Sequence, residues 1–155
     1  MIILLAVLTP ALAGCQTAAQ NSSGTSTQPQ SQTAVNEQMR TPLRNQLIAA
    51  AAKINGNVPV TQYAGLEPGR TYYAYDPATK TYWAGAGLVP RSDSTAAAVS
   101  VQDNGSYNLF RRTVGGSWTA YDVGLAGVGG TRCPIEPPAT ILRLWAWPTN
   151  TCHPA

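Results

Sequence analysis

Two of the three cysteines in this chain are placed for disulfide chemistry. Cys133 and Cys152 enclose the segment CPIEPPATILRLWAWPTNTC. In an oxidising compartment such a pair is expected to form one disulfide. A metal site is the alternative, but Cys133, Cys152 and His153 offer only three ligands, two of them adjacent, whereas a structural zinc site uses four. The spacing therefore predicts a disulfide, with no metal and no other cofactor.

Residues suited to acid–base catalysis are few and scattered. The single histidine, His153, stands between Cys152 and Pro154, and nothing around it in the sequence would orient a general base. Of the seven carboxylates, Asp76 and Asp103 lie in turn sequences, and no two are spaced as a catalytic pair. We therefore assign no catalytic residue and expect a non-enzymatic protein.

The third cysteine, Cys15, follows an apolar run and then small residues, in the order MIILLAVLTPALAGC. Fourteen residues are too few to cross a bilayer as a helix, which needs about 20. The motif Leu12-Ala13-Gly14-Cys15 resembles the lipobox of bacterial lipoproteins. The resemblance implies that residues 1–14 are a signal peptide and that Cys15 receives a diacylglycerol and a further acyl chain after cleavage. Two or more such chains hold a protein stably on a membrane.

The basic residues that usually begin such a signal are missing, because no Lys or Arg precedes Cys15. A start codon further upstream would supply them. An ordinary secretory signal with an incidental cysteine is the alternative.

Composition divides the rest of the chain into a tether and one domain. Residues 1–36 contain no charged and no aromatic side chain, and the stretch QTAAQNSSGTSTQPQSQTAV fills 16–35. So little apolar surface cannot offset the entropy of ordering the chain. We therefore expect the lipidated cysteine and a disordered tether over 15–36, and a single domain over 37–155.

Aromatic residues are the most prominent feature of that domain. Tyr72, Tyr73, Tyr75, Tyr82 and Trp83 fall on neighbouring predicted strands, so they must project from both faces of a sheet. Some of them are expected in the core as cross-strand pairs. The others would form an exposed surface for a protein or a glycan, since Tyr and Trp supply contact area at low entropic cost. Our candidates for this surface are Tyr73, Tyr75, Trp83 and Trp147, with Trp147 at its rim.

A helix and several strands must position these side chains. Thr41 is the expected N-cap of a helix over 41–54, with Pro42 in its first turn and an apolar stripe at helical spacing formed by Leu43, Leu47, Ala51 and Ile54. Strands are expected at 70–75, 81–89, 95–101, 107–112 and 118–123, with a sixth near 58–63. Turn sequences separate them, including Asp76-Pro77 and Asn104-Gly105. Inside the cysteine pair, residues 138–145 fit a short helix or a strand, and we favour the helix.

The predicted fold class is α+β: an N-terminal helix packed on an antiparallel meander of about five strands, with a disulfide-closed C-terminal segment. The helix would cover one face of the sheet, and the other face would be partly exposed to solvent. Residues 49–147 are similar in style to small secreted domains of high-GC bacteria, a resemblance that implies no activity.

The charge of the chain limits its partners. The formal net charge is only +3 and the basic residues are scattered, so no nucleic-acid-binding stripe is expected. The sequence predicts an extracytoplasmic lipoprotein, lipid-anchored to a bacterial cell membrane, that binds an envelope protein or glycan. The alternatives are a cell-wall hydrolase with paired carboxylates and a carrier of a small apolar ligand.

Overall fold

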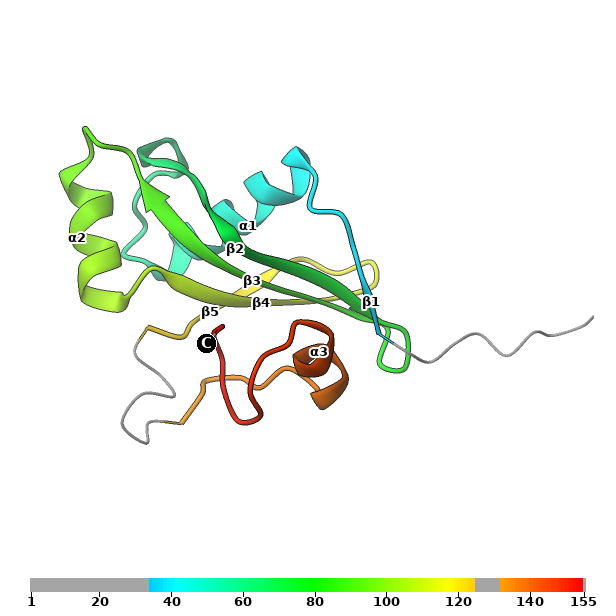
Figure 1. Ribbon diagram of the computed structural model, residues 1–155. Helices are drawn as coiled ribbons and strands as arrows, with labels where there is room; N and C mark the ends of the chain where they lie inside the picture. The colour runs from blue at the N-terminus through cyan, green and yellow to red at the C-terminus, as the bar shows by residue number, and fades with distance from the viewer. Residues whose placement is uncertain (1–33, 125–131, 155) are drawn as a thin grey trace, which may run out of the picture. The chain divides into compact units, whose positions relative to one another are not determined.

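An antiparallel meander of strands forms the centre of the fold, and each strand pairs with the next one along the chain (Figure 1). The computed structural model describes residues 34–124 and 132–154, all within one compact unit, Ser31–Ala155. The strands there are β1 (Val35–Asn36), β2 (Tyr63–Asp76), β3 (Thr81–Pro90), β4 (Tyr107–Thr113) and β5 (Thr119–Asp122). The helices are α1 (Thr41–Ile54), α2 (Thr95–Asn104), α3 (Ala139–Leu144) and the 3-10 turn η1 (Val60–Gln62). The predicted α+β class with an antiparallel sheet is confirmed.

Several predicted boundaries are wrong. Strand β1 precedes α1, so the helix is not the first element of the domain. Ala34 is buried and β1 pairs with β2, so a tether that reaches residue 36 is too long. Arg40, not Thr41, occupies the N-cap of α1. Of the predicted strands, the one at 58–63 is replaced by η1, while β2 begins at Tyr63 and contains the predicted 70–75.

The predicted strand at 95–101 is also wrong, because these residues form α2. Ser94 caps this helix: its Oγ accepts a hydrogen bond of 3.1 Å from the backbone N–H of Ala97. Gly105, at φ +80°, ends it, so Asn104-Gly105 is a helix end and not a hairpin turn. A strand would have buried Val99 beside Ala97, but Val99 is 46% exposed. Four of the five main predicted strands are thus confirmed, as β2 to β5.

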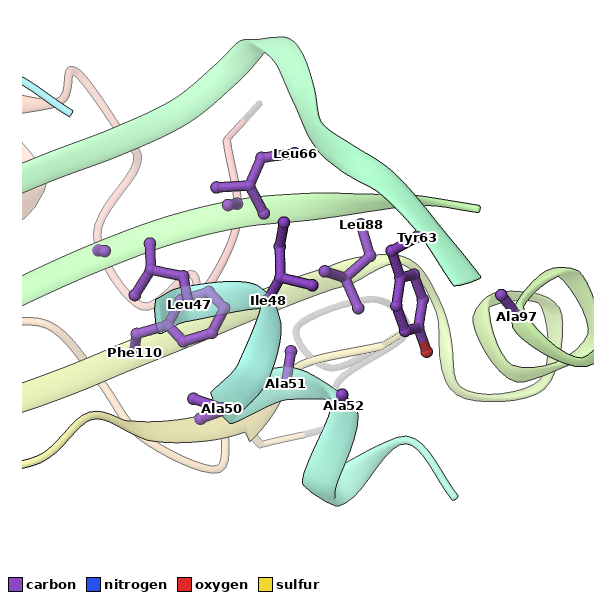
Figure 2. Packing of buried hydrophobic residues seen from close by; sticks show 13 residues of the cluster. Leu47, Ile48, Ala50, Ala51, Ala52, Tyr63, Leu66, Leu88, Ala97 and Phe110 are labelled. Atoms are coloured by element: carbon purple, nitrogen blue, oxygen red, sulfur yellow. The ribbon is translucent and has the colours of Figure 1, made fainter. Parts of the chain in front are cut away.

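Helix α1 packs on one face of the sheet along its predicted apolar stripe. Leu47 and Ala51 are fully buried, in one cluster with Phe110 of β4 and Leu88 of β3. Figure 2 shows Leu47 beside the Phe110 ring. The stripe ends before Ile54, which is 42% exposed.

The opposite face is covered by the C-terminal segment, whereas the sequence predicted partial exposure. Figure 1 shows α3 and α1 on opposite sides of the sheet. Ile141 and Leu142 of α3 are buried in a second cluster with Leu109 of β4. The predicted Cys133–Cys152 disulfide is confirmed, with Cα atoms 5.8 Å apart, and it closes the segment over this face. The sheet is therefore covered on both sides.

Two glycines of β3 make room for side chains from other elements. A Cβ on Gly85 would lie 2.8 Å from Tyr107 Oη and 2.9 Å from Trp147 Cη2. A Cβ on Gly87 would overlap the side chain of Glu67, which lies in an irregular stretch of β2 between Leu66 and Thr71. Close approach of other side chains thus accounts for both glycines.

Candidate functional site

The four aromatic residues predicted to form a binding surface lie on two different faces of the sheet. Trp83 and Trp147 are each only 5% exposed and belong to the cluster beneath the C-terminal segment. The Trp147 ring packs against Tyr72 at 5.1 Å, Trp145 at 4.9 Å and Tyr107 at 6.0 Å between centroids. The expectation that Trp147 lies at an exposed rim is therefore wrong, because the disulfide-closed segment folds its ring inward over Gly85. Neither tryptophan offers a surface to a partner.

Tyr73 and Tyr75 instead belong to a band of half-buried side chains on the face that carries α1. Tyr75 pairs with Tyr82 across β2 and β3, and Tyr82 pairs with Arg112 across β3 and β4. Trp118 directly precedes Thr119, which pairs with Arg111. The ring centroids of Tyr75 and Tyr82 are 4.6 Å apart, those of Tyr73 and Tyr82 5.8 Å, and those of Tyr73 and Trp118 6.2 Å. We call Tyr73, Tyr75, Tyr82, Arg112 and Trp118 the aromatic–arginine band.

Two tight turns at the same end of the sheet set the register of this band. In the β2–β3 turn, Asp76 accepts hydrogen bonds from the backbone N–H of Ala78 (3.1 Å) and from the hydroxyl of Thr79 (2.8 Å), as an aspartate at the first turn position does. In the β4–β5 turn, the N–H of Gly116 donates to the carbonyl of Thr113 (3.0 Å). Because these turns fix which residues pair, they bring Tyr75, Tyr82, Arg112 and Trp118 into one row.

Arg112 is the central residue of the band. Its guanidinium carbon lies 4.8 Å from the ring centroid of Tyr82 and 4.9 Å from that of Trp118, within the range of cation–π attraction. Its Nε is buried and has no hydrogen-bond partner. The ion pairs found in the described residues join Arg70 to Glu67 and Arg91 to Asp93, so Arg112 has no carboxylate of its own there.

Arg112 also acts on Tyr73. Burial raises the pKa of the Tyr73 phenol, while the charge of Arg112 and a side-chain hydrogen bond from it act in the opposite direction. Burial prevails, so the phenol stays protonated at neutral pH. The band thus presents three phenol rings, an indole and one guanidinium cation.

Two cavities adjoin the band, one beside the start of α1 and one beside its later turns. The first, of about 330 Å³, lies between α1 and the β4–β5 turn, and is lined by Gln46, Ala49, Ala50, Lys53, Arg112, Gly116, Ser117 and Trp118. The second, of about 380 Å³, lies by the start of α1 and includes Glu37, Arg40, Gln46 and Tyr73 among its lining residues. Gln46 lines both, and Tyr73 of the second contacts Trp118 of the first. Band and cavities therefore form one continuous polar and aromatic surface.

Two further cavities lie elsewhere. One of about 630 Å³, mostly apolar, separates the end of α1 from α2 and is lined by Val58, Ala96 and Val99, among others. The other, of about 380 Å³, lies by η1 and the start of α2. Asp103 lines the former and Asp93 the latter. None of the four cavities described brings two carboxylates together, which is the arrangement that glycoside hydrolysis uses.

The cysteine and histidine residues of the described chain do not form a metal site. The sulfurs of Cys133 and Cys152 are bonded to each other, so neither is a thiolate ligand. Nδ1 of His153 donates to the carbonyl of Pro154 at 2.9 Å, so the ring has a fixed partner that the sequence did not predict. Within residues 34–124 and 132–154, no three His, Cys, Asp or Glu side chains gather closely enough to hold a metal ion.

Three residues of the band are absent from the predicted surface: Tyr82, Arg112 and Trp118. A signal for them was available, since Tyr82 and Arg112 fall on adjacent strands and Gly115-Gly116 sets Trp118 opposite β4. However, the expected strand at 95–101 would stand between the strands of Tyr82 and Arg112 in a meander. Their pairing could therefore be deduced only after that strand had been excluded. The lipidation candidate, Cys15, lies outside the described residues.

Comparisons with known protein families, with curated proteins and with solved structures returned no match for this chain. Among the described residues, no helix is both long and apolar enough to span a bilayer.

Proposed function

We propose that this protein is a non-enzymatic binding module, lipid-anchored through Cys15 to the outer side of a bacterial cell membrane, which recognises an envelope glycan. The observation that carries the proposal is the aromatic–arginine band. Half-buried tyrosine and tryptophan rings offer rigid faces for stacking on sugar rings, and cations and amides beside them supply hydrogen bonds to hydroxyl groups. Two cavities adjoin the band, and ligand sites are usually concave.

The make-up of the surface favours a glycan over a protein partner. A protein interface is usually built around a well-desolvated apolar centre, whereas this surface is lined by Gln46, Lys53, Ser117 and Arg112 between its rings. The large exposed aliphatic residues of the described chain, Ile54, Val60, Val99 and Val114, do not belong to the band. Val99 lines the α1–α2 cavity, and Val114 lies alone in the β4–β5 turn.

The location rests on two observations. The Cys133–Cys152 disulfide fits an oxidising compartment, and the LAGC motif ending at Cys15 fits lipidation after export. Mass spectrometry of the N-terminal peptide from the native host tests the anchor. We expect the mature chain to begin at Cys15 with acyl chains attached, and an unmodified Cys15 would contradict the proposal.

Binding of the full chain to glycan fractions from a bacterial envelope tests the module itself, by isothermal titration calorimetry. Tyr82→Ala and Trp118→Ala should each weaken binding at least about tenfold, the usual effect of losing an aromatic anchor. Tyr121→Ala is the matched control, since Tyr121 is half-buried on the opposite face. Equal losses in all three variants, or no binding by the parent chain, would refute the proposal.

A second candidate function is carriage of a small apolar ligand in the α1–α2 cavity. Its volume of about 630 Å³ and the apolar side chains that line it support this alternative. An environment-sensitive apolar dye should then bind, and Val99→Asp should abolish the signal. A dye signal that is unchanged in Val99→Asp would exclude this site.

A further inference from the structure

We infer that the cavity between α1 and the β4–β5 turn binds the negatively charged group of an acidic sugar, a carboxylate or a phosphate, so that the glycan recognised by the aromatic–arginine band is an anionic one. This inference rests on the proposed function and names its ligand class. Its starting point is the composition of that cavity. Its lining contains two cations, Lys53 and Arg112, two neutral polar side chains, Gln46 and Ser117, and no carboxylate.

Arg112 has no anionic partner among the described residues. Its guanidinium lies between the rings of Tyr82 and Trp118, so the ring faces cover part of it and limit its contact with water. Taking a cation out of water is costly unless a charge or hydrogen bonds compensate. The rings and a hydrogen bond to Tyr73 supply part of this compensation, but no carboxylate of the described residues pairs with the guanidinium. The Arg112 fork is fixed in place and suited to bind an oxyanion through two parallel hydrogen bonds.

Lys53 extends the same charge along the wall of the cavity. A lysine in the last turn of a helix is favoured by the C-terminal carbonyl groups, and this accounts for Lys53 taken alone. It does not account for Arg112, which comes from β4, or for the absence of an acidic residue among the eight that line the cavity. Two cations from two elements therefore meet at one hollow without a counter-ion.

In the cavity by the start of α1, by contrast, the lining contains both an acidic and a basic side chain. There Glu37 stands with Arg40, next to Tyr73. The first cavity thus differs from the second in charge, although Gln46 lines both. An acidic sugar bound over the band would place its charged group in the first cavity and its neutral part against the rings. At about 330 Å³ the cavity is at the small end of ligand sites, which suits one sugar residue.

The test compares charged and neutral forms of one oligosaccharide on the full chain at low salt. The probes are a tetramer of galacturonic acid, its methyl ester, a phosphorylated oligosaccharide of similar length, and inorganic phosphate, each titrated calorimetrically. We expect at least one charged oligosaccharide to bind about tenfold or more tightly than the neutral ester, as charge-assisted hydrogen bonds to a fixed guanidinium would provide. Raising the ionic strength should reduce this preference.

Variants locate the effect. Lys53→Gln should weaken binding of the charged probe about two- to fivefold, and Arg112→Gln should abolish the preference for the charged probe over the ester. Arg143→Gln is the control, because it removes one exposed positive charge from α3, on the opposite face. If Arg143→Gln lowers affinity as much as Lys53→Gln, the effect belongs to the net charge and the inference is overturned.

The outcomes separate this inference from the proposed function. Equal affinity for charged and neutral oligosaccharides overturns the acidic-sugar inference and leaves glycan binding standing. If no oligosaccharide binds, both are overturned. Inorganic phosphate that binds as tightly as the charged oligosaccharides would show a bare anion site and would also overturn the inference. A preference for the carboxylated or for the phosphorylated probe supports it and identifies the charged group.

Discussion

Gly85 is the position where a single added methyl group should disturb the fold most clearly. It lies in β3 beneath two large rings, and an alanine Cβ there would be 2.8 Å from Tyr107 Oη and 2.9 Å from Trp147 Cη2. Ordinary contacts between such atoms are about 3.5–4.0 Å, so both rings must retreat by roughly 0.6 Å. Tyr107 and Trp147 are only 4% and 5% exposed, and the disulfide-closed segment holds Trp147 over the sheet. Each ring can retreat only by displacing buried neighbours.

The magnitude follows from two opposing effects. Overpacking of a well-packed core costs about 1–3 kcal/mol, while replacing a glycine inside a strand recovers about 0.5–1 kcal/mol of backbone entropy. Gly85→Ala should therefore lower the free energy of unfolding by about 1–2 kcal/mol. Urea denaturation followed by tryptophan fluorescence measures this change, which corresponds to a fall in Tm of roughly 4–10 °C.

A double-mutant cycle with Tyr107→Phe shows whether the steric cause is correct. Burial raises the pKa of the Tyr107 phenol, and its Oη has no hydrogen-bond partner, so Tyr107→Phe alone should cost little. In that background Gly85→Ala should cost less, by about 0.5–1 kcal/mol, because one of the two close contacts is gone. A Gly85→Ala protein as stable as the parent, or an equal loss in both backgrounds, would refute the reasoning.

Three further perturbations test other parts of the fold. Replacing Cys133 and Cys152 together by serine should cost about 3 kcal/mol, from the entropy of an unclosed loop, in urea titrations against the oxidised parent; an unchanged midpoint would contradict this. Ser94→Ala should cost about 1 kcal/mol and lower the helical ellipticity of α2, because Ser94 Oγ caps Ala97 and also donates to Gln62 Oε1 at 2.7 Å; an unaltered stability would count against the cap. Burial raises the pKa of Asp122, so the folded state holds that proton more tightly than the unfolded state and stability falls as pH rises through this pKa. Asp122→Asn should therefore be more stable than the parent near about pH 7 and lose this advantage towards about pH 3; an advantage that persists in acid would point to another cause.

Local sequence patterns correctly predicted the elements whose turns or ends they define. Asp76-Pro77 predicted the β2–β3 hairpin, and the hydrogen bonds of Asp76 are those of the expected turn. The apolar stripe through Leu47 and Ala51 predicted α1 and its buried face. The cysteine pair predicted the disulfide, since composition left few other uses for two thiols.

The wrong predictions arose where one sequence pattern is compatible with two local structures. In residues 95–101, Val99 and Val101 alternate as in a strand, but the Ser94 cap and three consecutive alanines favour a helix, and the helix prevails because Ala97 and Ser100 are enough to dock it. Asn104-Gly105 is equally a hairpin turn and a helix end. Local pattern alone does not separate these cases.

The candidate site was only half predictable for a different reason. The faces of Tyr73 and Tyr75 follow from strand alternation, but the fate of Trp147 depends on where a disulfide-closed segment packs, which is a tertiary question. The two glycines in the sequence Ala84-Gly85-Ala86-Gly87 are the trace of that packing in the sequence, because they mark where β3 must accept rings and side chains from elsewhere. The role of Arg112 follows only from strand register, which requires every preceding element to be correct.

Strand β1 determines where the chain enters the sheet. Val35 pairs with Tyr75, and the N–H of Glu37 donates to the carbonyl of Tyr73 at 2.9 Å, so the chain enters the sheet beside the band. Helix α2 occupies the other end of β3 and β4 (Figure 1). In the proposed lipid-anchored glycan binder, the chain would therefore enter the domain beside the sugar site, with α2 at the opposite end of the strands.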